Sequence, residues 1–181
     1  MDFESKITSR EISQLLWERE MTLGTAESCT GGRVAEAIIA VPGASKYFKG
    51  GIVSYADEIK ERILGVDRQL IEEKTAVCED VAVAMVKGAC KALNTDYAIA
   101  VTGIAGPGGG TAEIPVGTIW LACGSEDNVA TCQLTEDNGR DKNLSEATHT
   151  ALEMFLEFLK GEEKVSEDDV EPQGEVKWGS N

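Results

Sequence analysis

A continuously apolar stretch that runs directly into a glycine-rich loop constrains this fold more than any other feature. Residues 97–101 read Tyr-Ala-Ile-Ala-Val, a pattern typical of a central strand buried on both faces of a sheet. Such a sheet needs helices on both sides, so the stretch predicts an α/β fold. Thr102 ends the strand, and the eight residues from Gly103 to Gly110 include five glycines and one proline. Open α/β sheets bind ligands where such strands end, although a flexible connection is an equally good interpretation of this loop.

Helix and strand patterns alternate along the rest of the chain. Apolar residues at helical spacing predict helices at about 7–19, 34–41, 56–64, 79–93 and 143–160. Short apolar stretches predict strands at about 21–25, 52–55, 97–102, 116–122 and 128–134. Residues 1–160 are therefore expected to form one domain, a three-layer α/β/α sandwich. Residues 161–181 are acidic with few residues to bury, so we expect a disordered tail.

Charge and cysteine content exclude several classes of protein. The formal net charge of −15 opposes binding to nucleic acid. No apolar run approaches the roughly 20 residues that span a bilayer, and the first residues lack a signal-peptide pattern, so we expect a cytoplasmic protein without membrane association. Five widely spaced cysteines and a single histidine indicate neither a metal site nor a disulfide framework, and we expect no cofactor.

A turn rich in hydroxyl groups and glycine lies between the first predicted strand and the helix at 34–41. It contains Ser28, Thr30, Gly31 and Gly32. The N-termini of helices leave N–H groups unpaired, so this turn could present donors to a phosphate or an oxyanion. A simpler interpretation is that Ser28 or Thr30 caps the helix. Cys29 has no histidine near it in the sequence and is the weaker candidate for a nucleophile.

Three sequence blocks, taken together, resemble the C-terminal domain family of the competence/damage-inducible protein CinA. They are T-A-E-S-C-T-G-G at 25–32, G-G-I-V-S-Y at 50–55 and V-T-G-I-A-G-P-G-G-G at 101–110. Members of this family include stand-alone nicotinamide mononucleotide deamidases. The resemblance implies hydrolysis of nicotinamide mononucleotide to nicotinate mononucleotide and ammonia without a metal. It also implies a mixed five-stranded sheet with one antiparallel strand, and self-association, for which we expect a dimer.

The resemblance also implies roles for individual residues. By position, the family's catalytic residues fall on Ser28, Tyr55, Lys60 and Thr102, and a substrate-binding arginine falls on Arg140. We expect Ser28 to attack the carboxamide, Lys60, held neutral by desolvation, to take its proton, and Arg140 to bind the phosphate. On spacing alone, Lys60 and Arg140 would be solvated surface charges. The backbone groups and hydroxyl expected to bind the substrate or the oxyanion belong to Thr30, Gly31, Gly32, Gly103 and Gly106.

Several positions depart from the family's pattern, among them Ala56 in place of serine and Asn138-Gly139 in place of Gly-Asp before Arg140. Asp57 stands where asparagine is usual, Ile114 replaces a lysine, and Leu144 replaces a second arginine. Two lost cations weaken the case for an anionic substrate, the more so in an acidic protein. The alternative is therefore a non-catalytic paralogue that binds a nucleotide or a protein partner. A further possibility is the same hydrolytic site acting on another amide.

Overall fold

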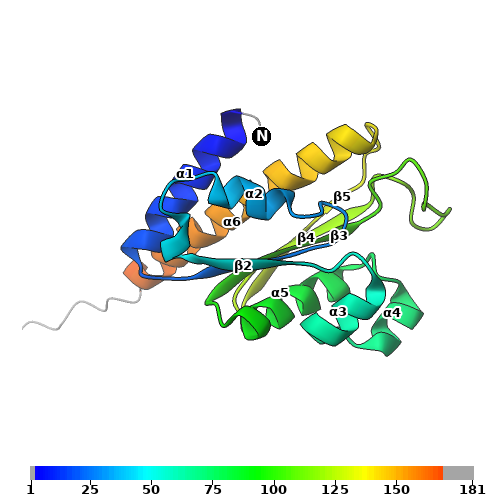
Figure 1. Cartoon of the computed structure of the whole chain (residues 1–181), viewed down its shortest axis with the longest axis horizontal. Helices are drawn as coiled ribbons and strands as arrows, with labels where there is room; N and C mark the ends of the chain where they lie inside the picture. Colours follow the sequence, from blue (N-terminus) through cyan, green and yellow to red (C-terminus); the bar gives the residue numbers. More distant parts are fainter. Residues whose placement is uncertain (1–2, 169–181) are drawn as a thin grey trace, which may run out of the picture.

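A computed structural model describes residues 3–168, with only the course of the backbone for residue 3 and residues 163–168. It shows a central sheet with helices on both faces (Figure 1). In chain order the elements are α1 Phe3–Glu18, β1 Leu23–Glu27, α2 Arg33–Ile39, the 3-10 turn η1 Ala44–Lys46, β2 Phe48–Val53, α3 Asp57–Leu64, α4 Arg68–Lys74, α5 Glu79–Leu93, β3 Tyr97–Gly103, β4 Ile119–Gly124, β5 Val129–Leu134 and α6 Arg140–Asp168.

The sheet has five strands in the order β2-β1-β3-β4-β5. Strands β2, β1 and β3 run parallel to one another, whereas β4 is antiparallel to both of its neighbours. The mixed sheet with one antiparallel strand is thus confirmed. Because β1, β2 and β3 run in the same direction, their carboxyl ends meet at one edge of the sheet, where α/β folds place their ligands.

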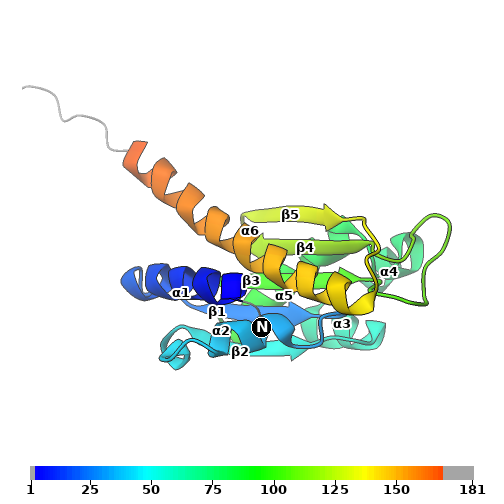
Figure 2. The same cartoon turned by 90° about the horizontal axis from the view of Figure 1, so that it is seen from above.

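Two hydrophobic cores fill the spaces between the three layers. Helices α1, α2 and α6 cover one face of the sheet, and α3, α4 and α5 cover the other (Figures 1 and 2). In β3, Ile99 and Val101 face the first group, and Ala98 and Ala100 face the second, as the alternation of side chains along a strand requires. No helix in the described part of the chain is long and apolar enough to cross a membrane.

Some boundaries differ from those that the sequence predicts. Strand β2 begins at Phe48 instead of residue 52, and its Gly51 lets β1 approach closely, since a Cβ there would lie 2.5 Å from Thr25 Oγ1. Helix α4 was not predicted, because none of its residues is buried and it has no apolar stripe to detect.

Helix α6 is longer at both ends than the predicted 143–160. Residues 161–168 continue this helix instead of belonging to the expected disordered tail. The Tyr97 hydroxyl donates a hydrogen bond to Glu162 Oε2 at 2.6 Å, and Arg19 Nη1 lies 4.0 Å from the same oxygen. These contacts favour order at Glu162, which the acidic composition did not reveal. The rest of the predicted tail, 169–181, lies outside the described residues.

Candidate functional site

A cavity of about 260 Å³ lies at the carboxyl ends of β1, β2 and β3. Seven of the ten predicted site residues line it, namely Ser28, Tyr55, Lys60, Thr102, Gly103, Gly106 and Arg140. The other residues that line it include Cys29, Asp57, Ala76, Val77 and Ala105. A larger cavity of about 400 Å³, between the end of β5 and α6, contains none of the predicted residues among its described lining. The chemistry therefore points to the smaller cavity.

The turn at Thr30, Gly31 and Gly32 does not line this cavity. Gly31 N–H donates to Ser28 O at 3.1 Å, and Gly32 N–H donates to Glu27 Oε2 at 3.0 Å. The expectation that these two amides face a ligand is therefore wrong, because both are already used inside the protein. Thr30 is buried, with 2% of its surface exposed.

Glu27 is a structural partner of the site that the sequence analysis missed. Glu27 is 1% exposed, and its carboxylate accepts hydrogen bonds from the N–H groups of Gly32, Val34 and Ala35 at 2.9–3.1 Å. A negative charge suits the N-terminus of a helix, where N–H groups lack partners. Glu27 thus caps α2, whose N-cap residue is Gly32, and neither Ser28 nor Thr30 does so. The available signal was an acidic residue within an apolar strand, a few residues before a helix.

Ser28 occupies a fixed position directly after β1. Its N–H donates to Val101 O at 2.9 Å, which ties the start of the turn to β3, and Ser28 lines the cavity. The neighbouring thiol of Cys29 is buried, and burial raises its pKa to about 11. Cys29 is therefore protonated at neutral pH, which leaves Ser28 as the better candidate for a nucleophile.

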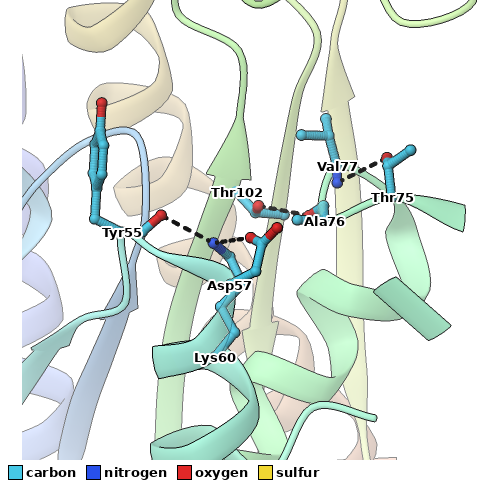
Figure 3. A network of polar contacts seen from close by, with 7 residues as sticks. All are labelled: Tyr55, Asp57, Lys60, Thr75, Ala76, Val77 and Thr102. Atoms are coloured by element: carbon cyan, nitrogen blue, oxygen red, sulfur yellow. Dashed lines mark hydrogen bonds and ion pairs between the residues drawn. The ribbon is translucent and has the colours of Figure 1, made fainter. Parts of the chain in front are cut away.

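Lys60 is brought to the cavity by α3 and is 1% exposed. Its Nζ donates hydrogen bonds to Tyr55 O at 3.4 Å and to Asp57 Oδ1 at 3.2 Å (Figure 3). Within the described residues, Nζ makes no hydrogen bond to Ser28. Desolvation was expected to keep this amine neutral, but the structure places it beside the carboxylate of Asp57. The structure therefore shows a lysine held by an acid instead of one paired with the serine.

Tyr55 lies at the exposed edge of the cavity. Its side chain is 64% exposed, and the ring points away from Lys60 and Thr102 (Figure 3). Its carbonyl oxygen accepts the hydrogen bond from Lys60. In this structure Tyr55 therefore contributes to the inner site through its backbone.

Thr102 is buried and supports one wall of the cavity. Its Oγ1 donates to Ala76 O at 2.7 Å (Figure 3), and Ala76 and Val77 line the cavity. The preceding Thr75 has φ 68° and ψ 166°, a conformation that β-branched residues rarely adopt. Thr75 Oγ1 accepts a bond from Val77 N–H at 3.2 Å. Hydrogen bonds thus hold a strained segment against the cavity.

The first turn of α6 holds the glycine-rich loop. Arg140 Nη1 donates to Gly106 O at 2.7 Å, and Asn143 Nδ2 donates to Ala105 O at 3.1 Å. Asn143 also bonds Asp137, and hydrogen bonds, first from the Asn143 side chain and then from a backbone N–H, lower the pKa of that carboxyl. The sequence analysis missed Asn143, which is 3% exposed. Its signal was a polar residue beside the apolar stripe of a helix.

The two positions with missing cations lie outside the cavity. Leu144 is buried in the core beneath α6, and Ile114 closes a turn with Thr111 through hydrogen bonds of 2.8 and 3.0 Å. The cations lining the cavity are therefore Lys60 and Arg140, beside the carboxylate of Asp57. Over residues 3–168, no group of three or more His, Cys, Asp or Glu side chains is arranged to hold a metal ion.

Comparisons with known proteins match most of the chain. A family model for the CinA C-terminal domain matches residues 5–159. A CinA-like protein of Amoebophilus asiaticus is 41% identical over 150 residues, covering 83% of this chain and 36% of that protein. A CinA-like protein of Leptospira borgpetersenii is 49% identical over 117 residues, covering 65% and 28%. The chain thus spans only 28% to 36% of the length of these curated relatives.

Solved structures match over nearly their whole length. The competence/damage inducible protein CihA from Agrobacterium tumefaciens superposes with a TM-score of 0.85 at 35% identity, covering 88% of this chain and 98% of that one. A competence-damaged protein (CinA) superfamily protein from Escherichia coli gives 0.83 at 34% identity, covering 87% and 92%.

Proposed function

Because the chain belongs to the CinA C-terminal domain family, we propose that it hydrolyses the carboxamide of nicotinamide mononucleotide to give nicotinate mononucleotide and ammonia. The observation that carries this proposal is the placement of Ser28, Lys60 and Arg140 around one cavity. These side chains supply a nucleophile, a base and a guanidinium that suits a phosphate. The volume of about 260 Å³ is near the lower end of small-molecule sites, which begin at roughly 300 Å³.

The proposed reaction uses a serine nucleophile and a lysine base. Ser28 Oγ bonds to the carboxamide carbon, the carbonyl electrons move onto oxygen, and neutral Lys60 takes the hydroxyl proton. The C–N bond then breaks, Lys60 returns the proton to the leaving nitrogen, and ammonia departs from an ester on Ser28. Water attacks this ester while Lys60 takes one of its protons. The C–Oγ bond then breaks, Lys60 gives that proton to Ser28 Oγ, and the product acid loses its remaining proton to water and leaves as the carboxylate.

The glycine-rich loop is the better source of donors for the oxyanion. The turn after Ser28 has committed Gly31 and Gly32 N–H internally. In the loop, Asn143 holds Ala105 O, and the C=O and N–H of a trans peptide point in opposite directions. Gly106 N–H is therefore directed away from Asn143 and is our candidate donor. In other enzymes one such donor contributes about 3–4 kcal/mol to the transition state.

Ammonia release from nicotinamide mononucleotide tests the proposal, measured with and without EDTA. We expect turnover that survives EDTA, and Ser28→Ala to lower kcat by about a thousandfold or more. Ser45→Ala is a matched control, because Ser45 is an exposed serine outside the residues that line the cavity. Loss of activity in both variants, or turnover that persists in Ser28→Ala, would contradict the serine mechanism.

The second candidate function is a non-catalytic, nucleotide-binding paralogue. The Asp57–Lys60 ion pair at 3.2 Å favours it, because this pair engages the proposed base. The burial of Leu144 also favours it, because this position provides no cation for an anionic substrate. It predicts thermal stabilisation by the mononucleotide without turnover. Hydrolysis of nicotinamide or of its riboside, without hydrolysis of the mononucleotide, would indicate another amide substrate. Self-association as a dimer is also part of the proposal, and light scattering measures it.

A further inference from the structure

An ion pair in the cavity opposes the proposed mechanism. Lys60 Nζ lies 3.2 Å from Asp57 Oδ1 and 3.4 Å from Tyr55 O (Figure 3). Both partners accept hydrogen bonds, which suits an ammonium ion with three N–H donors. A base needs a lone pair directed at the serine hydroxyl instead. In the observed arrangement Lys60 is therefore not positioned to act as the base.

The two members of this pair differ in their freedom to move. The side chain of Lys60 is 2% exposed, whereas that of Asp57 is 52% exposed. Asp57 is the first residue of α3, one turn before Lys60, so its carboxylate reaches the amine from the rim of the cavity. About half of the Asp57 side chain is already exposed to water, so it can turn outward at little cost in solvation.

No second carboxylate lines the cavity among the described residues. The other charged or titratable side chains that line it are those of Cys29, Tyr55 and Arg140. Burial raises the pKa of Cys29 to about 11, so this thiol carries no charge at neutral pH, and Arg140 is a cation. Asp57 is thus the carboxylate that contacts Lys60 from the cavity.

We propose that Asp57 is a positioning residue that restrains Lys60 and limits the rate of the reaction at neutral pH. While the pair persists, Lys60 stays an ammonium ion bonded to Asp57 and to Tyr55 O. When Asp57 turns outward, the ammonium gives its proton to water, and the neutral amine accepts the proton of Ser28. The inference rests on the proposed function. It identifies which contact must break before catalysis.

Asp57→Asn tests this role, because asparagine keeps the size of the side chain and removes its charge. We expect kcat for nicotinamide mononucleotide at pH 7 to rise about three- to tenfold, since a tenfold change corresponds to one pH unit in the acidic limb of the profile. That limb should move to lower pH, with KM unchanged. Glu58→Gln is the matched control, since Glu58 is the exposed neighbouring acid in the first turn of α3 and does not line the cavity.

Two outcomes of the kinetics would overturn the proposal. One is an Asp57→Asn profile that coincides with that of Glu58→Gln. The other is a change confined to KM, which would show that Asp57 only repels an anionic substrate.

A second readout needs no turnover. The pH titration of the Lys60 ¹³Cε resonance, assigned with Lys60→Met, should move to lower pH in Asp57→Asn. A titration that stays in place would overturn the role of Asp57. If the Lys60 titration moves to lower pH in Asp57→Asn but the protein does not hydrolyse the mononucleotide, the role of Asp57 would be supported and the proposed function refuted.

Discussion

At the scale of single residues, the Thr102 hydroxyl donates its proton to Ala76 O at 2.7 Å. This bond holds a segment that lines the cavity, which Thr102 lines as well, whereas the family resemblance implied a catalytic role. We expect Thr102→Val to raise KM several-fold with little change in kcat, and to lower the free energy of unfolding by about 1–2 kcal/mol, because Ala76 O loses its donor. Steady-state kinetics and urea unfolding measure both. Thr102→Ser keeps the hydroxyl and should restore KM, whereas a loss confined to kcat would indicate catalysis.

The site residues that the sequence predicted and those that it did not predict differ in the kind of partner that they contact. Ser28, Tyr55 and Thr102 lie at or just beyond the ends of three strands, so a strand pattern and a motif were sufficient to bring them together. Glu27 and Asn143 bond backbone groups outside their own elements. A polar residue in an apolar pattern marked each of them as unusual, but the sequence did not show which groups they bind. The ion pair of Lys60 with Asp57 was not predicted, because a spacing of three residues on a helix allows such a contact but does not show that it forms.

At the scale of elements, the turn between β1 and α2 is organised by a buried carboxylate. Gly31 and Gly32 resemble a phosphate-binding turn, but Glu27 already occupies the N-terminus of α2 with three hydrogen bonds. The N-terminus of a helix attracts anions, and here the anion is the carboxylate of Glu27. The strands of the sheet were predicted more reliably than the helices at its rim, because α4 buries no residue and leaves no apolar period to read.

Glu27→Gln should therefore loosen the turn that carries Ser28. The amide keeps one acceptor oxygen but turns an NH2 group toward backbone N–H donors, and the charge that favours the helix terminus is lost. We expect the free energy of unfolding to fall by about 2–3 kcal/mol, the magnitude for hydrogen bonds to a charged group, and kcat to fall with it. Urea unfolding and ammonia release measure the two effects. Glu36→Gln, which removes an exposed acid from the same helix, should change neither.

At the scale of the whole molecule, helix α6 connects the site to the far end of the sheet. Its first turn holds the glycine-rich loop through Arg140 and Asn143, and Glu162 near its other end accepts a bond from Tyr97. Burial, followed by this bond, raises the pKa of the Tyr97 hydroxyl. The same long helix packs against the sheet beside α1. Alkaline pH is therefore expected to weaken the core as a whole.

Three buried thiols make this alkaline weakening measurable. Burial raises the pKa of Cys29 and Cys90 to about 11 and that of Cys123 to about 12, whereas a thiol in the unfolded chain titrates near ~8.5. Above that pH the folded state binds more protons than the unfolded one, so stability falls as pH rises. The stabilising contribution is complete below pH ~8.5 and is lost on the way to the folded pKa values.

The slope of the free energy of unfolding against pH tests whether the buried thiols cause the loss of stability at alkaline pH. Each thiol contributes at most about 1.4 kcal/mol per pH unit, so we expect the free energy of unfolding, measured by urea under reducing conditions, to drop by several kcal/mol between pH 8.5 and 10.5. Cys123→Ala, at a position that is 0% exposed, should be less stable at pH 7 because it leaves a cavity, yet lose less stability on going to pH 10.5. Parallel curves for the variant and the natural protein would show that Cys123 does not carry this dependence.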